Sequence, residues 1–165
     1  MLAIINLRGV LFADASSGAR LAETRTLSTS YTGIAFRPGD RELWVSETAR
    51  NGPDSIAIIQ ISDLGLPGKI DRIKLDKGHP LPAGIAFSVD GATAYVAFSR
   101  SNTVAVIDAA GRKIVREIEV GMAPFSVALA TKHDLLFVTN RAGRRPKQGD
   151  TVAPSSGSNV GTDAA

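Results

Sequence analysis

Three short apolar blocks recur along this chain, and their spacing limits the folds that it can adopt. The blocks are Gly33–Phe36 (GIAF), Gly84–Phe87 (GIAF) and Ser126–Leu129 (SVAL), which start 51 and 42 residues apart. A second apolar stretch follows each block, at residues 43–46, 94–97 and 136–140. Self-similarity with a period of about 20–50 residues is typical of repeat architectures. The sequence therefore predicts an array of similar units built from short strands.

The clearest unit spans residues 82–123 and has the pattern of four antiparallel strands. Its strands are expected at residues 84–88, 93–98, 103–108 and 113–120. Asp90-Gly91 between the first two strands is typical of a tight hairpin turn. The fourth strand mixes charged and apolar side chains on both faces, which indicates an edge strand partly facing water. A meander of four strands over about 40–45 residues has the size of one propeller blade.

The rest of the chain divides into parts of further blades. We predict the outer half of a blade over residues 1–30, a blade over 31–81, a blade over 82–123, the first half of a blade over 124–139, and a flexible loop or tail over 140–165. The last segment has no aromatic residue and buries too little apolar surface to offset its ordering entropy. The predicted fold class is all-β, an incomplete array of two full and two half blades, whereas a propeller closes with about four to eight.

Composition and charge exclude several classes of function. Lys and Arg number 19 against 16 Asp and Glu, and four of the cations, Arg141, Arg144, Arg145 and Lys147, lie in one short stretch. A nucleic-acid surface needs many phosphate contacts on one face, so we expect no nucleic-acid partner. No apolar stretch approaches the roughly 20 residues that span a bilayer, and the first residues lack the basic region of a signal peptide. The chain has no cysteine, which excludes disulfides and thiolate metal sites.

Residue types that carry catalysis or bind metals are sparse. The two histidines, His79 and His133, lie in non-equivalent connections, which argues against a shared metal site. Asp40, Asp90 and Asp134 recur in the same hairpin, where Asp is favoured because it bonds its local backbone. We therefore predict no catalytic, cofactor-binding or metal-binding residue, and no cofactor.

One rim of the array is the expected place for ligand binding. In a meander blade, the connection to the next blade emerges on the same side as the loop between the second and third strands. Polar loops on a rigid scaffold commonly carry function, so binding is expected on this side. The candidate rim residues are Tyr31, Arg50, Asn51, His79, Arg100, Asn102, Met122, Arg141, Arg144 and Arg145.

The second and third strands carry motifs of a known family. Leu136–Asn140 (LFVTN), Ala94–Ala97 (AYVA) and Thr103–Asp108 (TVAVID) resemble the bacterial YVTN-type propeller repeats over about residues 10–140. The resemblance implies a seven-bladed propeller that is periplasmic, extracellular or attached to the cell surface. Some members carry a C-terminal phosphoesterase domain, and residues 140–157 look like an inserted loop of that subgroup. Phe137 replaces the name-giving Tyr, and residues 131–134 replace the usual Pro-Asp-Gly turn.

Two functional hypotheses follow. The first is a non-catalytic binding or scaffold portion of an exported bacterial propeller, which presents loops on one rim to a protein, glycan or small ligand. The alternative is the propeller portion of a hydrolase, either phosphoesterase-fused or lactonase-like. In either case the expected partners are the remaining propeller blades or another copy of the chain, because a blade is normally covered by a neighbour on each face.

Overall fold

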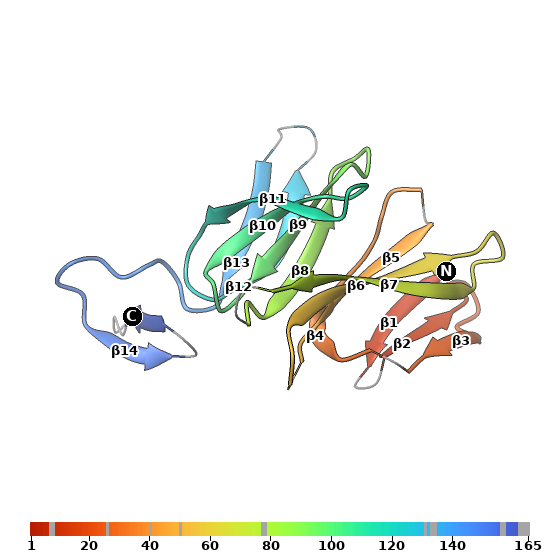
Figure 1. Cartoon of the computed structure of the whole chain (residues 1–165), viewed down its shortest axis with the longest axis horizontal. Helices are drawn as coiled ribbons and strands as arrows, with labels where there is room; N and C mark the ends of the chain where they lie inside the picture. Colours follow the sequence, from red (N-terminus) through yellow and green to blue (C-terminus); the bar gives the residue numbers. More distant parts are fainter. Residues whose placement is uncertain are drawn as a thin grey trace.

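Antiparallel strands make up all the regular structure that is described. The computed structural model describes residues 1–6, 9–25, 27–39, 41–49, 51–76, 79–130, 132, 135–155 and 158–161. Within these ranges every regular element is a β-strand, which confirms the all-β fold class, and no helix there is long and apolar enough to cross a membrane. Each sheet is a meander in which consecutive strands pair (Figure 1).

Two complete four-stranded sheets form the centre of the molecule. The first contains β4 (Thr29–Phe36), β5 (Glu42–Glu47), β6 (Asp54–Ile61) and β7 (Pro67–Leu75). The second contains β8 (Pro82–Phe87), β9 (Thr93–Phe98), β10 (Thr103–Asp108) and β11 (Lys113–Glu119). We call them blade B and blade C. Figure 1 shows β1–β3 on one side of blade B and β8–β13 on the other.

Smaller sheets flank these two blades. Sheet A contains β1 (Leu2–Asn6), β2 (Gly9–Ala13) and β3 (Arg20–Thr24), and sheet D contains β12 (Pro124–Ala130) and β13 (Leu135–Asn140). A separate hairpin contains β14 (Val152–Ser155) and β15 (Ser158–Gly161). Sheet A thus has three strands in the segment predicted as the outer half of a blade. The hairpin lies in the segment predicted as a flexible loop or tail.

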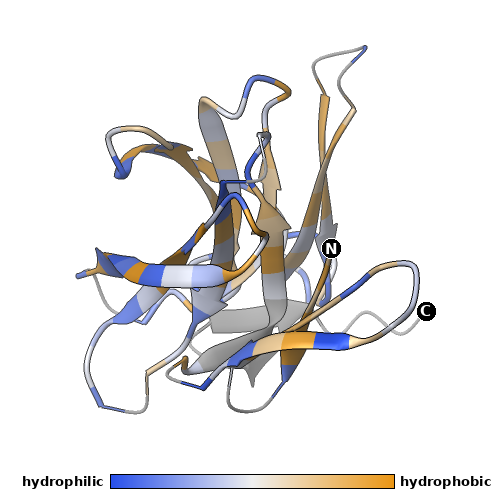
Figure 2. Cartoon of the chain, turned by 90° about the vertical axis from the view of Figure 1, so that its right-hand side faces the viewer, coloured by the Kyte–Doolittle hydropathy of each residue, from blue (hydrophilic) through white to orange (hydrophobic). Residues whose placement is uncertain are grey.

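Apolar side chains between successive sheets form the core. One cluster joins blades B and C and includes Trp44, Ile58, Val96 and Ile107. Two further clusters join sheet A to blade B and blade C to sheet D. The inner strands β5, β6, β9 and β10 are buried on both faces, whereas β11 is mostly exposed, as the charge pattern of an edge strand predicts. Figure 2 shows apolar residues banded along the strands and hydrophilic residues in the connecting loops.

The glycine that opens the repeated block marks the closest approach of neighbouring sheets. A Cβ atom on Gly33 would overlap the carbonyl oxygen of Ala83 and the side chain of Ser46. A Cβ atom on Gly84 would lie 2.8 Å from the carbonyl oxygen of Phe125 in the next sheet. The first strands of adjacent sheets therefore leave no room for a side chain at this position.

Candidate functional site

The loops after the second strand of each sheet are bonded to the segment that enters the same sheet. The amide of Thr48 donates to the carbonyl of Ser28 at 2.8 Å, and the amide of Ser99 donates to the carbonyl of Leu81 at 3.1 Å. In sheet D the equivalent bond from the amide of Arg141 to the carbonyl of Ala123 is 3.0 Å. Second-to-third-strand loops and inter-sheet connections thus share one rim, which we call the loop rim.

Polar caps hold the two connections that enter blade C and sheet D on the loop rim. The Asp54 carboxylate accepts a hydrogen bond from the amide of Leu81 at 2.9 Å, and the Asn102 side-chain oxygen accepts one from the amide of Ala123 at 2.8 Å. Leu81 and Ala123 have positive φ values of 57° and 51°, and each precedes a proline that starts the next sheet. Since non-glycine residues rarely adopt this conformation, the caps stabilise a strained entry.

His79 lies beside the first of these caps. Its Nδ1 is 3.6 Å from Oδ1 of Asp54, and its side chain is 46% exposed while that of Asp54 is 2% exposed. The same Asp54 oxygen accepts a hydrogen bond from the amide of Ala49 at 3.1 Å. His79 and Asn102 therefore lie on the loop rim, and the described contacts of Asn102 include this structural cap.

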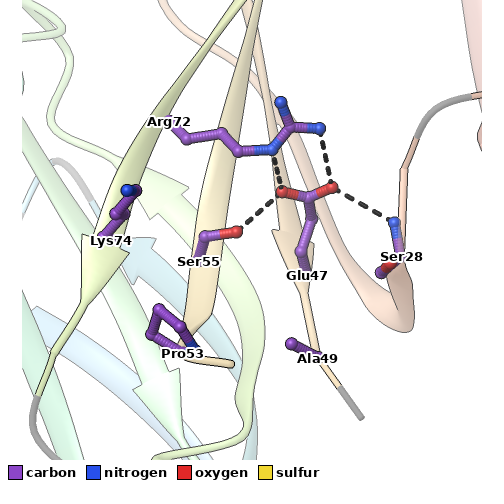
Figure 3. A pocket seen from close by; sticks show the side chains of 7 residues that line it. All are labelled: Ser28, Glu47, Ala49, Pro53, Ser55, Arg72 and Lys74. Atoms are coloured by element: carbon purple, nitrogen blue, oxygen red, sulfur yellow. Dashed lines mark hydrogen bonds and ion pairs between the residues drawn. The ribbon is translucent and has the colours of Figure 1, made fainter. Parts of the chain in front are cut away.

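The loop rim of blade B also contains a pocket of about 280 Å³. Its lining comes from the ends of β5, β6 and β7 and from the segment before β4: Ser28, Glu47, Ala49, Pro53, Ser55, Arg72 and Lys74. Figure 3 shows the Glu47 carboxylate at its centre, between Arg72, Ser55 and Ser28.

The Glu47 side chain is only 5% exposed, and four donors satisfy its carboxylate. Ser55 donates its hydroxyl at 2.7 Å, and Arg72 donates Nε at 2.8 Å and a terminal nitrogen at 3.3 Å. The backbone amide of Ser28 completes the set at 3.1 Å. A buried carboxylate needs such compensation, because desolvation of an unpaired charge is costly.

This polar cluster occurs in blade B and is replaced at the equivalent positions of blade C. Strand register aligns Glu47 with Phe98, since each ends the second strand opposite the start of the third. It likewise aligns Arg72 with Glu117 and Lys74 with Glu119. Phe98 is buried with 2% exposure, so an apolar side chain fills this place in the repeat. The buried carboxylate and its ion pair thus occur in blade B and not in blade C, so the repeated fold does not require them.

The charge of the pocket is positive. Arg72 offsets Glu47, and Lys74 is exposed and forms no ion pair with any other residue that the structure describes. One cation therefore remains available at the edge of the pocket.

The three arginines of the basic stretch contact other groups of the chain. Arg144 contacts both oxygens of Asp150 at 2.6 and 3.1 Å, and the Arg144 hydrogen bond lowers the pKa of Asp150 to about 2. Arg145 donates to the carbonyls of Val120 and Asn102, both at 2.8 Å. The guanidinium of Arg141 lies 4.8 Å from the ring centroid of Phe125. These contacts hold the segment after β13 against blade C and sheet D.

The other predicted rim residues do not form a joint site among the described side chains. Asn51 and Arg100 are exposed, whereas Met122 is buried with 3% exposure. The side chain of Tyr31 and all of Arg50 lie outside the described residues, as do Asp40, His133 and Asp134. Within the described part of the chain, no three His, Cys, Asp or Glu side chains gather as a metal site would require.

Sequence reasoning missed the pocket residues Glu47, Ser55, Arg72 and Lys74. The signal that could have found them is the comparison of the repeats with each other, since Glu47 stands where blade C has Phe98. A charged residue within an apolar strand of one repeat and not of the next marks a position that packing alone does not explain.

Comparison with known proteins supports the architecture. No protein-family profile matches the sequence, and no curated protein matches it. Among solved structures, hydrazine synthase of Kuenenia stuttgartiensis superposes with a TM-score of 0.65 at 16% identity, over 82% of this chain and 52% of that one. The chain has a β-propeller fold.

Two further propeller structures match over a similar share of this chain. The periplasmic gluconolactonase PpgL of Pseudomonas aeruginosa has a TM-score of 0.56 at 13% identity, over 87% of this chain and 51% of its own. A Bacteroides fragilis protein assigned as a 6-phosphogluconolactonase has a TM-score of 0.59 at 18% identity, over 84% of this chain and 38% of its own. The chain spans about half or less of the length of these proteins.

Proposed function

We propose that this chain is the non-catalytic, ligand-binding portion of a β-propeller protein, and that the blade B pocket holds the ligand. The observation that supports the proposal is the buried carboxylate of Glu47, paired with the partly exposed Arg72, at a position where the equivalent blade carries a buried Phe98. Burial of a carboxylate is costly unless it is paired and hydrogen-bonded, and apolar packing fills the same place in blade C, so its presence in one blade favours a role in recognition.

The ligand class follows from the donors around the pocket. Glu47 fixes Arg72 in place, and Lys74 adds a cation that has no ion-pair partner among the described residues. The hydroxyls of Ser28 and Ser55 lie on the same lining. A small carboxylate that also carries hydroxyl groups, such as a sugar acid, matches this combination of one positive charge and several polar groups.

Titration of the full chain with sodium gluconate, followed by amide NMR, tests this proposal. We expect shifts confined to residues around the pocket, and we expect Lys74→Gln to weaken binding about tenfold or more, because a hydrogen bond to a charged group contributes about 1.5–3 kcal/mol. Lys113→Gln, an exposed lysine on the outer strand of blade C, is the matched control and should bind like the unmodified chain. Equal binding by Lys74→Gln, or no shifts in the unmodified chain, would contradict the proposal. Inorganic phosphate in a parallel titration distinguishes a carboxylate site from a general anion site.

A propeller lactonase is the second candidate, and the two lactonase-named structures favour it. For this candidate the chain would supply part of the wall of a hydrolase whose substrate is a sugar lactone. Hydrolysis of glucono-δ-lactone by the full chain, followed in a pH-stat with and without added divalent cations, separates the two functions. The binding function predicts no acceleration over buffer, and a saturable rate would replace it with the lactonase.

The proposal also covers the family and the cellular location of the chain. We propose that the chain belongs to the YVTN-type repeats, and its TVAVID and LFVTN strands support this assignment. Proteins of that kind act outside the cytoplasm, so the corresponding expectation is export to the periplasm or the cell surface. Fractionation of the source bacterium tests it, and a protein found only in the cytoplasm would contradict it.

A further inference from the structure

An aromatic residue recurs at one position of the second strand in three successive sheets. Strand register pairs Trp44 with Ala35, Tyr95 with Ala86 and Phe137 with Ala128. Trp44 is fully buried between blades B and C, where its ring meets that of Phe87 edge-on at 5.2 Å. Tyr95 packs in the cluster that joins blade C to sheet D. This side chain is thus the contact that each sheet offers to the next one.

Phe137 occupies the same position in sheet D but is 60% exposed. Leu135, two residues earlier and on the same face of β13, is 52% exposed. The equivalent aromatic side chain is buried in blade B and partly buried in blade C, where a following sheet covers it. Exposed apolar side chains on the same face of sheet D therefore indicate an interaction surface. We call this surface the front face of sheet D.

The opposite end of the stack has a second apolar surface. Ala3, Ile5 and Phe12 of sheet A point toward blade B and belong to the cluster between them. Leu2 and Ile4 alternate with these residues on β1, so they lie on the other face, where they are 49% and 42% exposed. Leu21 of β3 is 47% exposed as well. We call this surface the back face of sheet A; Figure 2 views the molecule from this side.

The geometry points to a head-to-tail contact between two copies of this chain, in which the front face of sheet D in each copy packs against the back face of sheet A in the other. The contact continues the interface that the chain already forms three times, because each sheet places its front face against the back face of the next. Such a contact is heterologous, and it forms a closed ring when the rotation per sheet returns to the start. Leaving aside the separate β14–β15 hairpin, two copies would stack eight sheets, four from each chain, which is within the range of about four to eight at which propellers close.

The absence of cysteine from the chain allows a direct cross-linking test. We would prepare Phe137→Cys and Ile4→Cys separately, mix them, and oxidise the mixture under mild conditions. The head-to-tail contact predicts a disulfide dimer in the mixture and little dimer in either variant alone. Leu64→Cys, at an apolar residue that is 84% exposed on the β6–β7 turn, is the control for random collision. Cross-linking of Phe137→Cys with itself, or of Leu64→Cys to the same extent, would overturn the inference.

Solution mass provides a second measurement that does not depend on new thiols. Light scattering of the unmodified chain should give twice the monomer mass of 17.3 kDa. Phe137→Asp should give the monomer with an unchanged far-ultraviolet spectrum, because the replaced side chain is exposed within one copy. A folded monomer for the unmodified chain at all concentrations, or an open series of larger species, would overturn the closed pair.

Discussion

At the scale of single residues, the repeated block is explained by what each position meets in the neighbouring sheet. Gly33 and Gly84 lie where the first strand touches the next sheet, and the alanine two residues later leaves space for the aromatic ring across the strand pair. The short distance between neighbouring backbones therefore requires the small glycine and alanine. The gap between the sheets requires a large aromatic side chain to fill it.

Replacement of Gly84 by alanine should lower the free energy of unfolding by about 1–3 kcal/mol, because overpacking against a backbone forces local displacement. Gly33→Ala should have at least as large an effect, since its Cβ would overlap two neighbours. Gly68→Ala is the control, because a Cβ there would make an ordinary contact at 3.6 Å. Urea unfolding monitored by tryptophan fluorescence measures all three. Equal stability of Gly84→Ala and Gly68→Ala would contradict the close-approach explanation.

At the scale of elements, several polar contacts join blades B and C on the rim opposite the loop rim, and Glu42 lies among them. Glu42, at the start of β5, accepts hydrogen bonds from Trp44 at 3.1 Å and Gln60 at 3.2 Å and pairs with Arg37 at 3.2 Å. Arg112 of the β10–β11 turn reaches it from blade C at 3.4 Å. Partial burial acts to raise the pKa of Glu42, but the hydrogen bonds from Trp44, Gln60 and Arg37 outweigh it and lower the pKa.

Because the pKa of Glu42 is lower in the folded chain, its stabilising contribution is present above the unfolded value near 4.5 and is lost as the pH falls through the folded value. Glu42→Gln should therefore destabilise the chain at pH 7. The variant should also lose less stability than the unmodified chain when the pH is lowered. Asp63→Asn, which removes an exposed carboxylate paired with Arg41, should change neither the stability at pH 7 nor its fall in acid. Thermal unfolding between pH 3 and 7 measures the difference. Parallel pH profiles for Glu42→Gln and the unmodified chain would contradict this role.

At the scale of the whole molecule, the sequence predicts the stack of sheets better than the site. The strand order, the Asp90-Gly91 turn and the edge character of β11 follow from local patterns, because alternation and turn chemistry act within a few residues. The Glu47–Arg72 pair joins residues 25 positions apart, and Arg145 reaches carbonyls as far as 43 positions away. Such contacts depend on how strands align across a sheet or between sheets, which residue type alone does not reveal.

The two caps on the loop rim bear on how the chain unfolds. Asp54 starts the third strand of blade B yet holds the entry of blade C, and Asn102 just ahead of β10 does the same for sheet D. Loss of one sheet therefore frees a strained backbone segment in its neighbour as well as an apolar face. Nearest-neighbour coupling of this kind makes a stack of repeats melt as a cooperative unit rather than sheet by sheet. Hydrogen exchange should accordingly report similar opening free energies for β6 and β10, although the two strands belong to different sheets.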